Sequence, residues 1–344
     1  MLKTRNTLLF LALLAALLLV FLLNIASGQV AIPVKEVFKS LFGGHASKDT
    51  WDYIIVNFRL PKAITAVLVG IGLSISGLLM QTLFRNPLAG PYVLGLSSGS
   101  SLGVALVILG AGTLPPVLAD LLLSPYGIIL ASCTGSLLVL LMILIVSQRL
   151  RDTMSILIVG LMFSSFTSAI VSVFSYFSTA EQLQKYTFWS MGSIGNISWL
   201  NIAILVICVM IGLLLSLLSL KPLDALLLGE NYAKSMGLNI SRTRYIIIFA
   251  TSILAGSITA FAGPIAFIGL AIPHLAKLLF RTSNHYILFF GTLLIGAIIM
   301  LFCDMVSQMP GFEFTIPINA ITSIIGAPMV IWLIIRRKNK NNVI

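Results

Sequence analysis

The chain has 344 residues, of which 58% are hydrophobic and only 9% are charged, and its mean hydropathy is +1.08. Soluble domains carry about 25% charged residues, so composition excludes a soluble enzyme or a soluble binding domain. The formal net charge of +11 would suit nucleic-acid binding, but the distribution of the basic residues along the chain is that of a membrane protein.

Ten apolar segments succeed one another along the chain. About 20 apolar residues are enough to cross the hydrocarbon core of a bilayer, and we expect ten spans at 7–27, 60–83, 92–110, 126–147, 154–177, 199–219, 244–262, 264–281, 286–306 and 316–335. Because backbone groups in hydrocarbon must pair within each span, the spans are expected to be helices. The prediction is an all-α membrane protein with about ten transmembrane helices, in one domain that covers 1–344.

The first apolar segment has two interpretations. Lys3 and Arg5 precede the apolar run, as in a signal peptide, and Ile25-Ala-Ser27 is a conceivable cleavage site. The run is longer than a usual signal core, and its removal would leave an odd number of spans. We therefore expect an uncleaved first helix.

Two polar excursions are expected on the outer side. The segment 28–59 is partly amphipathic, and within it Pro33 to Phe42 is predicted to form a short helix on the membrane surface. The second excursion, Glu181 to Gly192, combines polar residues with interfacial aromatic residues.

The chain divides into two halves of five spans. Each half has a helix rich in small residues followed by a proline-interrupted stretch, Asn86 to Pro91 in the first half and Ala262 to Pro273 in the second. Five is odd, so two related halves would lie in opposite orientations. Inverted repeats with broken helices are typical of transporters.

The longest inner loop, 221–239, is expected to form two short helices. Pro222 suits the first position of a helix, and Gly229 can end that helix in the left-handed conformation. A second helix fits from Glu230 to Met236 and is closed by Gly237; within it Glu230 and Lys234 stand in the favourable i, i+4 order. Such a hairpin suits docking onto another protein, or it lies on the lipid headgroups, and the residues alone leave both interpretations open.

The basic residues indicate the orientation of the chain. With the N-terminus inside, the inner segments contain Lys3, Arg5, Arg85, Arg149, Arg151, Lys221, Lys234, Arg242, Arg244, Lys277, Arg281, Arg336, Arg337, Lys338 and Lys340. The outer segments contain Lys35, Lys39, Lys48, Arg59, Lys62 and Lys185. This bias follows the positive-inside rule and predicts that both termini are cytoplasmic.

Eight short motifs occur in order along nearly the whole chain. They are Arg59-Leu-Pro-Lys62, Ser76-Gly-Leu-Leu-Met-Gln81, Asn86-Pro-Leu-Ala89, Leu94-Gly-Leu-Ser-Ser-Gly99, Trp189-Ser-Met-Gly-Ser193, Leu228-Gly-Glu-Asn-Tyr-Ala-Lys-Ser-Met-Gly-Leu238, Phe267-Ile-Gly-Leu-Ala-Ile-Pro-His274 and Ile325-Gly-Ala-Pro328. In these motifs the chain resembles the FecCD-like permease family of type II ABC importers, which take up ferric siderophores, haem and cobalamin.

The resemblance implies an assembly in the bacterial cytoplasmic (inner) membrane. It has two ten-helix permease subunits, identical or different, with two ATP-binding-cassette ATPase subunits inside and a substrate-binding protein outside. The chain contains no Gly-x-x-x-x-Gly-Lys-Ser/Thr loop, so ATP and Mg are expected on the partner ATPase and no cofactor is expected in this chain. The family's coupling helices match 221–239, with Leu228, Gly229, Glu230, Ala233, Lys234 and Gly237 as the coupling residues.

The resemblance also implies a docking site for the binding protein. Family members use basic residues at the positions of Arg59 and Lys62 to engage acidic residues of that protein; alternatively, both side chains anchor the second span at the headgroups. Gln308 stands where the family often has another arginine, so one docking charge is missing or comes from a sister subunit.

A row of hydroxyl groups in the fifth span is a candidate pathway. Ser164, Ser168, Ser172 and Ser175 recur at helical spacing, although small residues also allow close helix packing. The family places an inner gate near Asn86, Leu88 and the loop Arg151 to Met154, of which we assign Asn86, Leu88 and Thr153.

Other chemistry-bearing residues indicate little. Cys133, Cys208 and Cys303 lie in separate spans without ligand spacing, and His274 has no second ligand nearby in sequence, so no metal site is expected. Asp304 is the one acid deep in a span; intramembrane acids are often functional, but it could equally cap a helix or pair with a neighbour.

Three classes of function are open to a membrane protein of this kind. The first is an ABC importer permease that moves a metal chelate by alternating access, with ferric siderophore ahead of haem and cobalamin. The second is an ion-coupled secondary transporter, which needs buried charges along several spans. The third is a membrane-embedded enzyme, which needs a cluster of His, Asp, Glu or Cys. We expect the first, and therefore a transport subunit rather than an enzyme.

Overall fold

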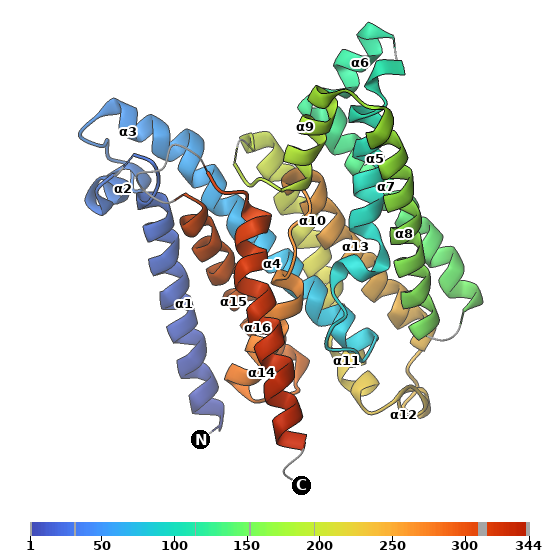
Figure 1. Ribbon diagram of the computed structural model, residues 1–344. Helices are drawn as coiled ribbons and strands as arrows, with labels where there is room; N and C mark the ends of the chain where they lie inside the picture. Colours follow the sequence, from blue (N-terminus) through green and yellow to red (C-terminus); the bar gives the residue numbers. More distant parts are fainter. Residues whose placement is uncertain are drawn as a thin grey trace. The chain divides into compact units, whose positions relative to one another are not determined.

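The computed structural model describes residues 2–30, 32–113, 115–150, 153–195, 197–308 and 315–341, and all regular structure in this part of the chain is helical (Figure 1). The helices are α1 (Leu2–Ala26), α2 (Val34–Leu41), α3 (Asp49–Ile54), the π-helix η1 (Ile55–Arg59), α4 (Leu60–Leu83), the 3-10 helix η2 (Pro91–Leu94), α5 (Leu96–Ile108), the 3-10 helix η3 (Ala111–Thr113), α6 (Pro116–Leu122), α7 (Pro125–Arg149), α8 (Thr153–Phe177), α9 (Ala180–Ser190), α10 (Trp199–Leu218), α11 (Leu220–Leu227), α12 (Glu230–Ser235), α13 (Ile240–Ala262), α14 (Ile268–Phe280), α15 (His285–Ser307) and α16 (Ile318–Asn341).

The predicted ten-helix membrane protein is confirmed. Within the described residues, seven helices are long and apolar enough to cross a bilayer, and three shorter apolar helices, α5, α14 and the first part of α16, account for the remaining predicted spans. The seven are α1, the continuous run from α3 to α4, α7, α8, α10, α13 and α15.

The third and eighth spans are shorter than predicted because the chain breaks before each helix. Before α5, Pro91 opens the short η2 and Gly95 takes a left-handed φ of +80°. Before α14, Gly263 has φ +74° and Phe267 has φ +67°, and the amide of Ala266 donates to Asn319 Oδ1 at 2.9 Å. These are the two proline-interrupted stretches singled out in the sequence.

The second span is longer than predicted. The short surface helix was expected and is present as α2, but residues 49–59, assigned to the same excursion, are helical and continue into α4. The junction is η1, in which the amide of Leu60 donates to Ile55 O, five residues back. Single π-turns of this kind often occur at functional sites.

The residues divide into two compact units. Unit 1 contains Met1–Ser74, Ser193–Val206 and Ile265–Ile344, and unit 2 contains Ile75–Gly192 and Ile207–Pro264. Two of the boundaries fall inside α4 and α10, the other two fall between helices, and the units do not coincide with the two five-span halves of the sequence.

Unit 1 is built around α15. Helices α1, α14 and α16 pack against it, and the guanidinium of Arg5 on α1 donates to Phe280 O at the end of α14 at 2.7 Å. At the crossing of α4 and α15, a Cβ on Gly70 would lie 2.3 Å from Gly296 O. Only glycine permits this approach, as in other close helix pairs of membrane proteins.

Unit 2 is built around the contact of α5 with α7. A Cβ on Gly99 would lie 2.6 Å from Gly135 O, and one on Gly135 would lie 2.1 Å from Gly99 O. The hydroxyls of Ser100 and Ser136 are hydrogen-bonded to each other across the same contact. Small residues let the two backbones meet, and the hydroxyl pair stabilises the crossing.

Candidate functional site

The loop 221–239 forms the predicted pair of short helices, α11 and α12, in unit 2. The first helix begins at Leu220, so the prediction that Pro222 occupies its first position is wrong; Pro222 is the third residue, which still lies in the first turn, where no intrahelical donor is required. The second helix runs from Glu230 to Ser235, one residue shorter than predicted.

Gly229 forms the junction of this hairpin, which we call the 220–237 hairpin. Its φ of +119° and ψ of 147° lie in a region that is open to glycine and closed to other residues. The predicted stop at Gly229 is therefore present, although its conformation is extended rather than left-handed helical. Its amide donates to Leu226 O at 3.2 Å and so satisfies a carbonyl at the end of α11.

The end of α12 is a Schellman motif. The amide of Gly237 donates to Lys234 O at 2.9 Å, and the amide of Leu238 donates to Ala233 O at 3.0 Å. Asn239 then caps α13, because its Oδ1 accepts from the amide of Arg242 at 2.9 Å. The end of α12 and the start of α13 are thus fixed by local hydrogen bonds.

The hairpin presents an exposed apolar surface. Four side chains on it are between 45% and 65% exposed: Leu227, Leu228, Tyr232 and Met236. Of the predicted coupling residues, Leu228 and Lys234 are on this exposed side, Glu230 is half-buried, and Ala233 is fully buried, where it contributes packing rather than a contact surface.

Two arginines that sequence reasoning did not assign to the site hold the hairpin in place. Arg85 Nη2 donates to Leu226 O at 2.6 Å, and Arg244 Nη2 lies 3.7 Å from Glu230 Oε1. A cation at the C-terminal carbonyls of a helix is favourable. Both arginines are predicted inner cations, but only the fold brings them to the junction of α11 and α12.

A groove lies along α8 in unit 2. It has a volume of about 690 Å³ and is lined by Ser98 of α5 and by Leu161, Ser164, Ser165, Ser168, Ala169 and Ser172 of α8. The three serines assigned to the pathway are therefore brought together on one open face, whereas Ser175 is outside the lining.

Three of the five serine hydroxyls that line this groove donate to carbonyls of their own helix. Ser164 Oγ donates to Gly160 O at 3.0 Å, Ser165 Oγ to Leu161 O at 3.2 Å and Ser172 Oγ to Ser168 O at 2.9 Å. Each donor is used within α8, which leaves oxygen lone pairs as acceptors toward the groove. The lining is therefore weakly polar and carries no charged residue.

The predicted gate segment follows α4 as a tight turn. Asn86 Oδ1 accepts from the amide of Leu88 at 2.9 Å, and the amide of Ala89 donates to Asn86 O at 3.0 Å. Asn86 thereby closes the turn, and Leu88 is 47% exposed at its tip. Thr153 is the first residue of α8, but its side chain and residues 151–152 lie outside the described part of the chain.

Arg59, predicted to dock the binding protein, is buried in unit 1. Its guanidinium donates to Ile25 O at 2.7 Å, to Ala26 O at 2.8 Å and to Val30 O. The bonds to Ile25 and Ala26 satisfy carbonyls in the last turn of α1 that have no intrahelical partner, and the bond to Val30 holds the segment that follows α1. A Cβ on Gly28 would lie 2.9 Å from the guanidinium, so glycine at position 28 makes room for this cap.

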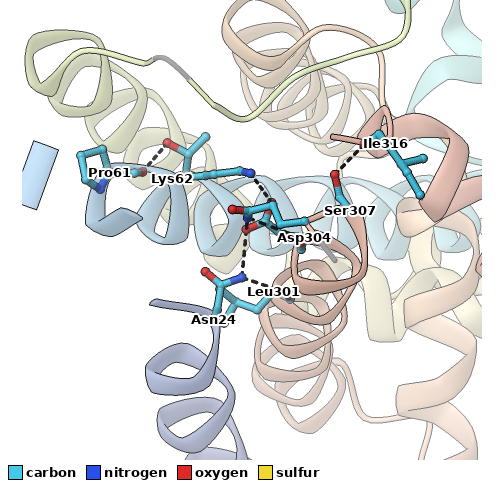
Figure 2. Close-up of polar contacts among 9 residues, drawn as sticks. Asn24, Pro61, Lys62, Leu301, Asp304, Ser307 and Ile316 are labelled. Atoms are coloured by element: carbon cyan, nitrogen blue, oxygen red, sulfur yellow. Dashed lines mark hydrogen bonds and ion pairs between the residues drawn. The ribbon is translucent and has the colours of Figure 1, made fainter. Parts of the chain in front are cut away.

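Lys62, the second predicted docking cation, belongs to a buried polar cluster that we call the Asp304 cluster (Figure 2). Lys62 Nζ lies 3.0 Å from Asp304 Oδ1. Asp304 Oδ2 accepts from Asn24 Nδ2 at 2.9 Å and from Gln308 Nε2 at 2.8 Å. Asp304 is fully buried, and its partners come from α1, α4 and the end of α15.

These contacts explain two features of the sequence. Asp304 pairs with a neighbour, which was one of the alternatives left open for it, and Gln308 is a donor to the same carboxylate. Both docking cations have partners within unit 1, and their contact with a binding protein stays a prediction. A signal for this cluster was present in the sequence: a lysine, an acid and two amides all lie near the predicted outer ends of their spans.

Comparison with known proteins gives the family. The sequence model of the FecCD transport family matches residues 16–336. A proposed ABC transporter permease of Methanocaldococcus jannaschii is 33% identical over 92% of this chain and 93% of that protein. The vitamin B12 import system permease protein BtuC of Vibrio parahaemolyticus is 32% identical over 89% of each chain.

A solved structure agrees with the sequence comparison. An inward-facing conformation of a proposed metal-chelate type ABC transporter superposes with a TM-score of 0.82 at 29% identity, over 95% of this chain and 99% of that one. ABC permeases of this kind are multi-pass membrane subunits, assemble as dimers with ATPase partners and are not enzymes themselves. The agreement in sequence and in fold extends over nearly the whole chain, which belongs to the FecCD transport family of type II ABC importer permeases.

Proposed function

We propose that this permease subunit moves a metal chelate, with ferric siderophore as the first candidate, across the bacterial cytoplasmic membrane. Alternating access exposes the pathway to one side and then to the other, and the energy comes from ATP and Mg bound by two separate ATPase subunits. A second permease subunit, identical or different, completes the pathway, and an extracytoplasmic binding protein delivers the substrate.

The observation that carries this proposal is the exposed apolar surface of the 220–237 hairpin. A helix that lies on headgroups inserts its apolar face into the lipid and turns a basic face to water. Here the apolar residues are distributed over two helices whose junction is held by Gly229, Arg85 and Arg244. A preorganised apolar surface with a central aromatic residue, Tyr232, is the kind of surface that a protein partner recognises.

The groove on α8 is the proposed substrate path. Its lining combines serine oxygens with Leu161 and Ala169, so it offers contact without a strong binding site. A conduit must bind its cargo weakly enough to release it. In this proposal Asn86, Leu88 and Thr153 belong to the inner gate, and selectivity comes from the binding protein.

The class of substrate rests on relatives. The similar solved structure is described as of metal-chelate type, which favours an iron chelate. A second candidate is cobalamin, because a vitamin B12 permease is 32% identical over most of both chains; haem is the third.

An ion-coupled mechanism is less consistent with the chain. Proton relays need a sequence of titratable groups across the membrane. The buried acid Asp304 is instead engaged by Lys62, Asn24 and Gln308 in one cluster. A neutralised ion pair suits a structural role better than proton transfer.

Uptake in proteoliposomes tests the proposal. The chain is reconstituted with its ATPase and its binding protein, and labelled ferric siderophore, haem and cobalamin are compared side by side. Accumulation of the siderophore that needs both ATP and the binding protein is the expected result. Accumulation of cobalamin or haem would replace the substrate, and uptake driven by an ion gradient without ATP would overturn the mechanism.

A further inference from the structure

Arg85 connects two parts of the proposed machinery in unit 2. It follows the end of α4 and directly precedes the turn from Asn86 to Ala89, which contains the proposed gate residues. Its side chain reaches the other part, because Nη2 donates to Leu226 O of the 220–237 hairpin at 2.6 Å. One residue therefore belongs to the turn by its backbone and to the hairpin by its side chain.

The backbone of Arg85 is unusual for an arginine. Its φ is +47°, and its amide donates to Thr82 O at 3.2 Å as the last turn of α4 ends. Glycine or asparagine adopts this left-handed conformation with less strain. The backbone thus gives no reason for arginine at this position, and the reason is to be sought in the guanidinium.

The bond to Leu226 has the geometry of a strong contact. It is short, its donor is charged, and its acceptor is one of the last carbonyls of α11, where a positive charge is favourable. A Cβ placed on Gly229 would lie 3.9 Å from Arg85 Nη2, so the guanidinium lies against the junction of α11 and α12. A displacement of that junction therefore moves the atoms that Arg85 contacts.

A short path of contacts leads on from the turn. Asn86 closes the turn through its bond from the amide of Leu88, and the turn continues into η2, which packs against α8. At the end of η2, a Cβ on Gly95 would lie 3.1 Å from Gly160 O and 3.4 Å from Ser164 Oγ. Ser164 lines the groove on α8, so the path joins the hairpin to the groove within one compact unit.

We propose that Arg85 is a positioning residue that transmits movement of the 220–237 hairpin to the 86–89 turn and through it to α8. The inference rests on the proposed function, in which the hairpin docks onto an ATPase. When the ATPase displaces the hairpin, the turn follows because Arg85 holds Leu226. Without that bond the hairpin still docks, but its movement no longer reaches the turn.

The test separates docking from transmission. Arg85→Asn keeps a residue that tolerates the left-handed backbone but is too short to reach Leu226, and Arg85→Lys keeps one charged donor. The control is Arg242→Gln, which removes an arginine that is exposed in the first turn of α13. Each variant is assembled as the complete transporter, and three quantities are measured: ATPase affinity, ATP hydrolysis rate and labelled chelate taken up per ATP hydrolysed.

For Arg85→Asn we expect unchanged ATPase affinity and hydrolysis, with uptake per ATP lower by about tenfold, the factor that one charge-assisted hydrogen bond carries. Arg85→Lys should recover part of the loss, and the control should match the wild type. If Arg85→Asn does not insert, Arg85→Gly removes the same side chain and relaxes the same backbone, so it gives the same readout.

Three results would overturn the inference, and they are distinguishable. An unchanged ratio of uptake to hydrolysis in Arg85→Asn means that the bond transmits nothing. A parallel loss of ATPase affinity means that Arg85 only stabilises the docking surface. Absence of ATP-dependent uptake in the wild-type complex removes the proposed function itself, and the inference with it.

Discussion

The Asp304 cluster in unit 1 and the 220–237 hairpin in unit 2 use polar side chains in opposite ways. In the Asp304 cluster a fully buried carboxylate is engaged by a lysine and two amides from three helix ends. In the hairpin two arginines contact Leu226 and Glu230 at the junction, while four apolar side chains are exposed. A buried ion pair with two further hydrogen bonds fixes helices to one another, whereas an anchored but exposed apolar surface suits contact with a partner.

The largest expected effect is the loss of the Asp304 carboxylate. Asp304→Leu leaves the mostly buried Lys62 without its ion pair and removes the acceptor of Asn24 and Gln308. Breaking one partner of a buried pair costs about 3–5 kcal/mol. The measurement is thermal unfolding of the purified protein in detergent, with Asp120→Asn on the exposed α6 as the control.

The double variant Lys62→Met/Asp304→Leu sharpens this result. Replacing both charges with apolar groups is often neutral, so most of the stability should return. If the double variant is as unstable as Asp304→Leu, the amides rather than the ion pair hold α1 and α15 together.

The next effect is at the junction of the hairpin. Gly229→Pro requires a φ near −65° where the chain has +119° and removes the donor to Leu226 O, which costs about 3 kcal/mol or more. We expect uptake to be abolished while membrane insertion is intact. Gly229→Ala, which meets no steric contact closer than 3.9 Å but has the same unfavourable φ, should fall between Gly229→Pro and the wild type; unchanged uptake in Gly229→Pro would refute the coupling role.

A smaller effect is expected on the exposed face of the hairpin. Tyr232→Ala removes the aromatic centre of the apolar surface, and truncation of such a residue typically lowers affinity for a protein partner by about tenfold or more. Affinity for the ATPase is measured with the permease in detergent. Leu121→Ala on α6 truncates a side chain that is 67% exposed and should leave this affinity unchanged; an unchanged affinity in Tyr232→Ala would place the ATPase surface elsewhere.

The two regions also differ in how far the sequence predicted them. The spans follow from composition, and the ends of the two hairpin helices follow from single glycines, Gly229 and Gly237. Such local signals can be recognised in the sequence alone. The partners of Arg59, Arg85 and Asp304 lie between 4 and 280 residues away in sequence, and most become visible only when the helices are packed. Residues 49–59 were assigned to the outer excursion, and their helical continuation into α4 becomes visible only in the packed structure, where Arg59 caps α1.

The smallest effect concerns the polar contacts of Glu36 in unit 1, whose partner Lys39 has a side chain that is 44% exposed. The amide of Ser47 donates to Glu36 Oε2 at 2.7 Å, and Lys39 lies 3.2 Å from Oε1. The Ser47 bond and, to a lesser degree, Lys39 lower the pKa of Glu36 below its ordinary value of 4.5. Because the pKa of Glu36 is lower in the folded state, its contacts stabilise this segment above pH 4.5. That stabilisation is lost as the pH falls through the lowered pKa.

Hydrogen-exchange protection of the Ser47 amide measures this contact, at neutral pH and well below pH 4.5. We expect protection at neutral pH and its loss in acid, whereas Glu36→Gln, which cannot ionise, should give weaker protection that does not change with this titration. Protection of the Ser47 amide that stayed unchanged in acid would show that the ionised Glu36 carboxylate is not what holds this amide.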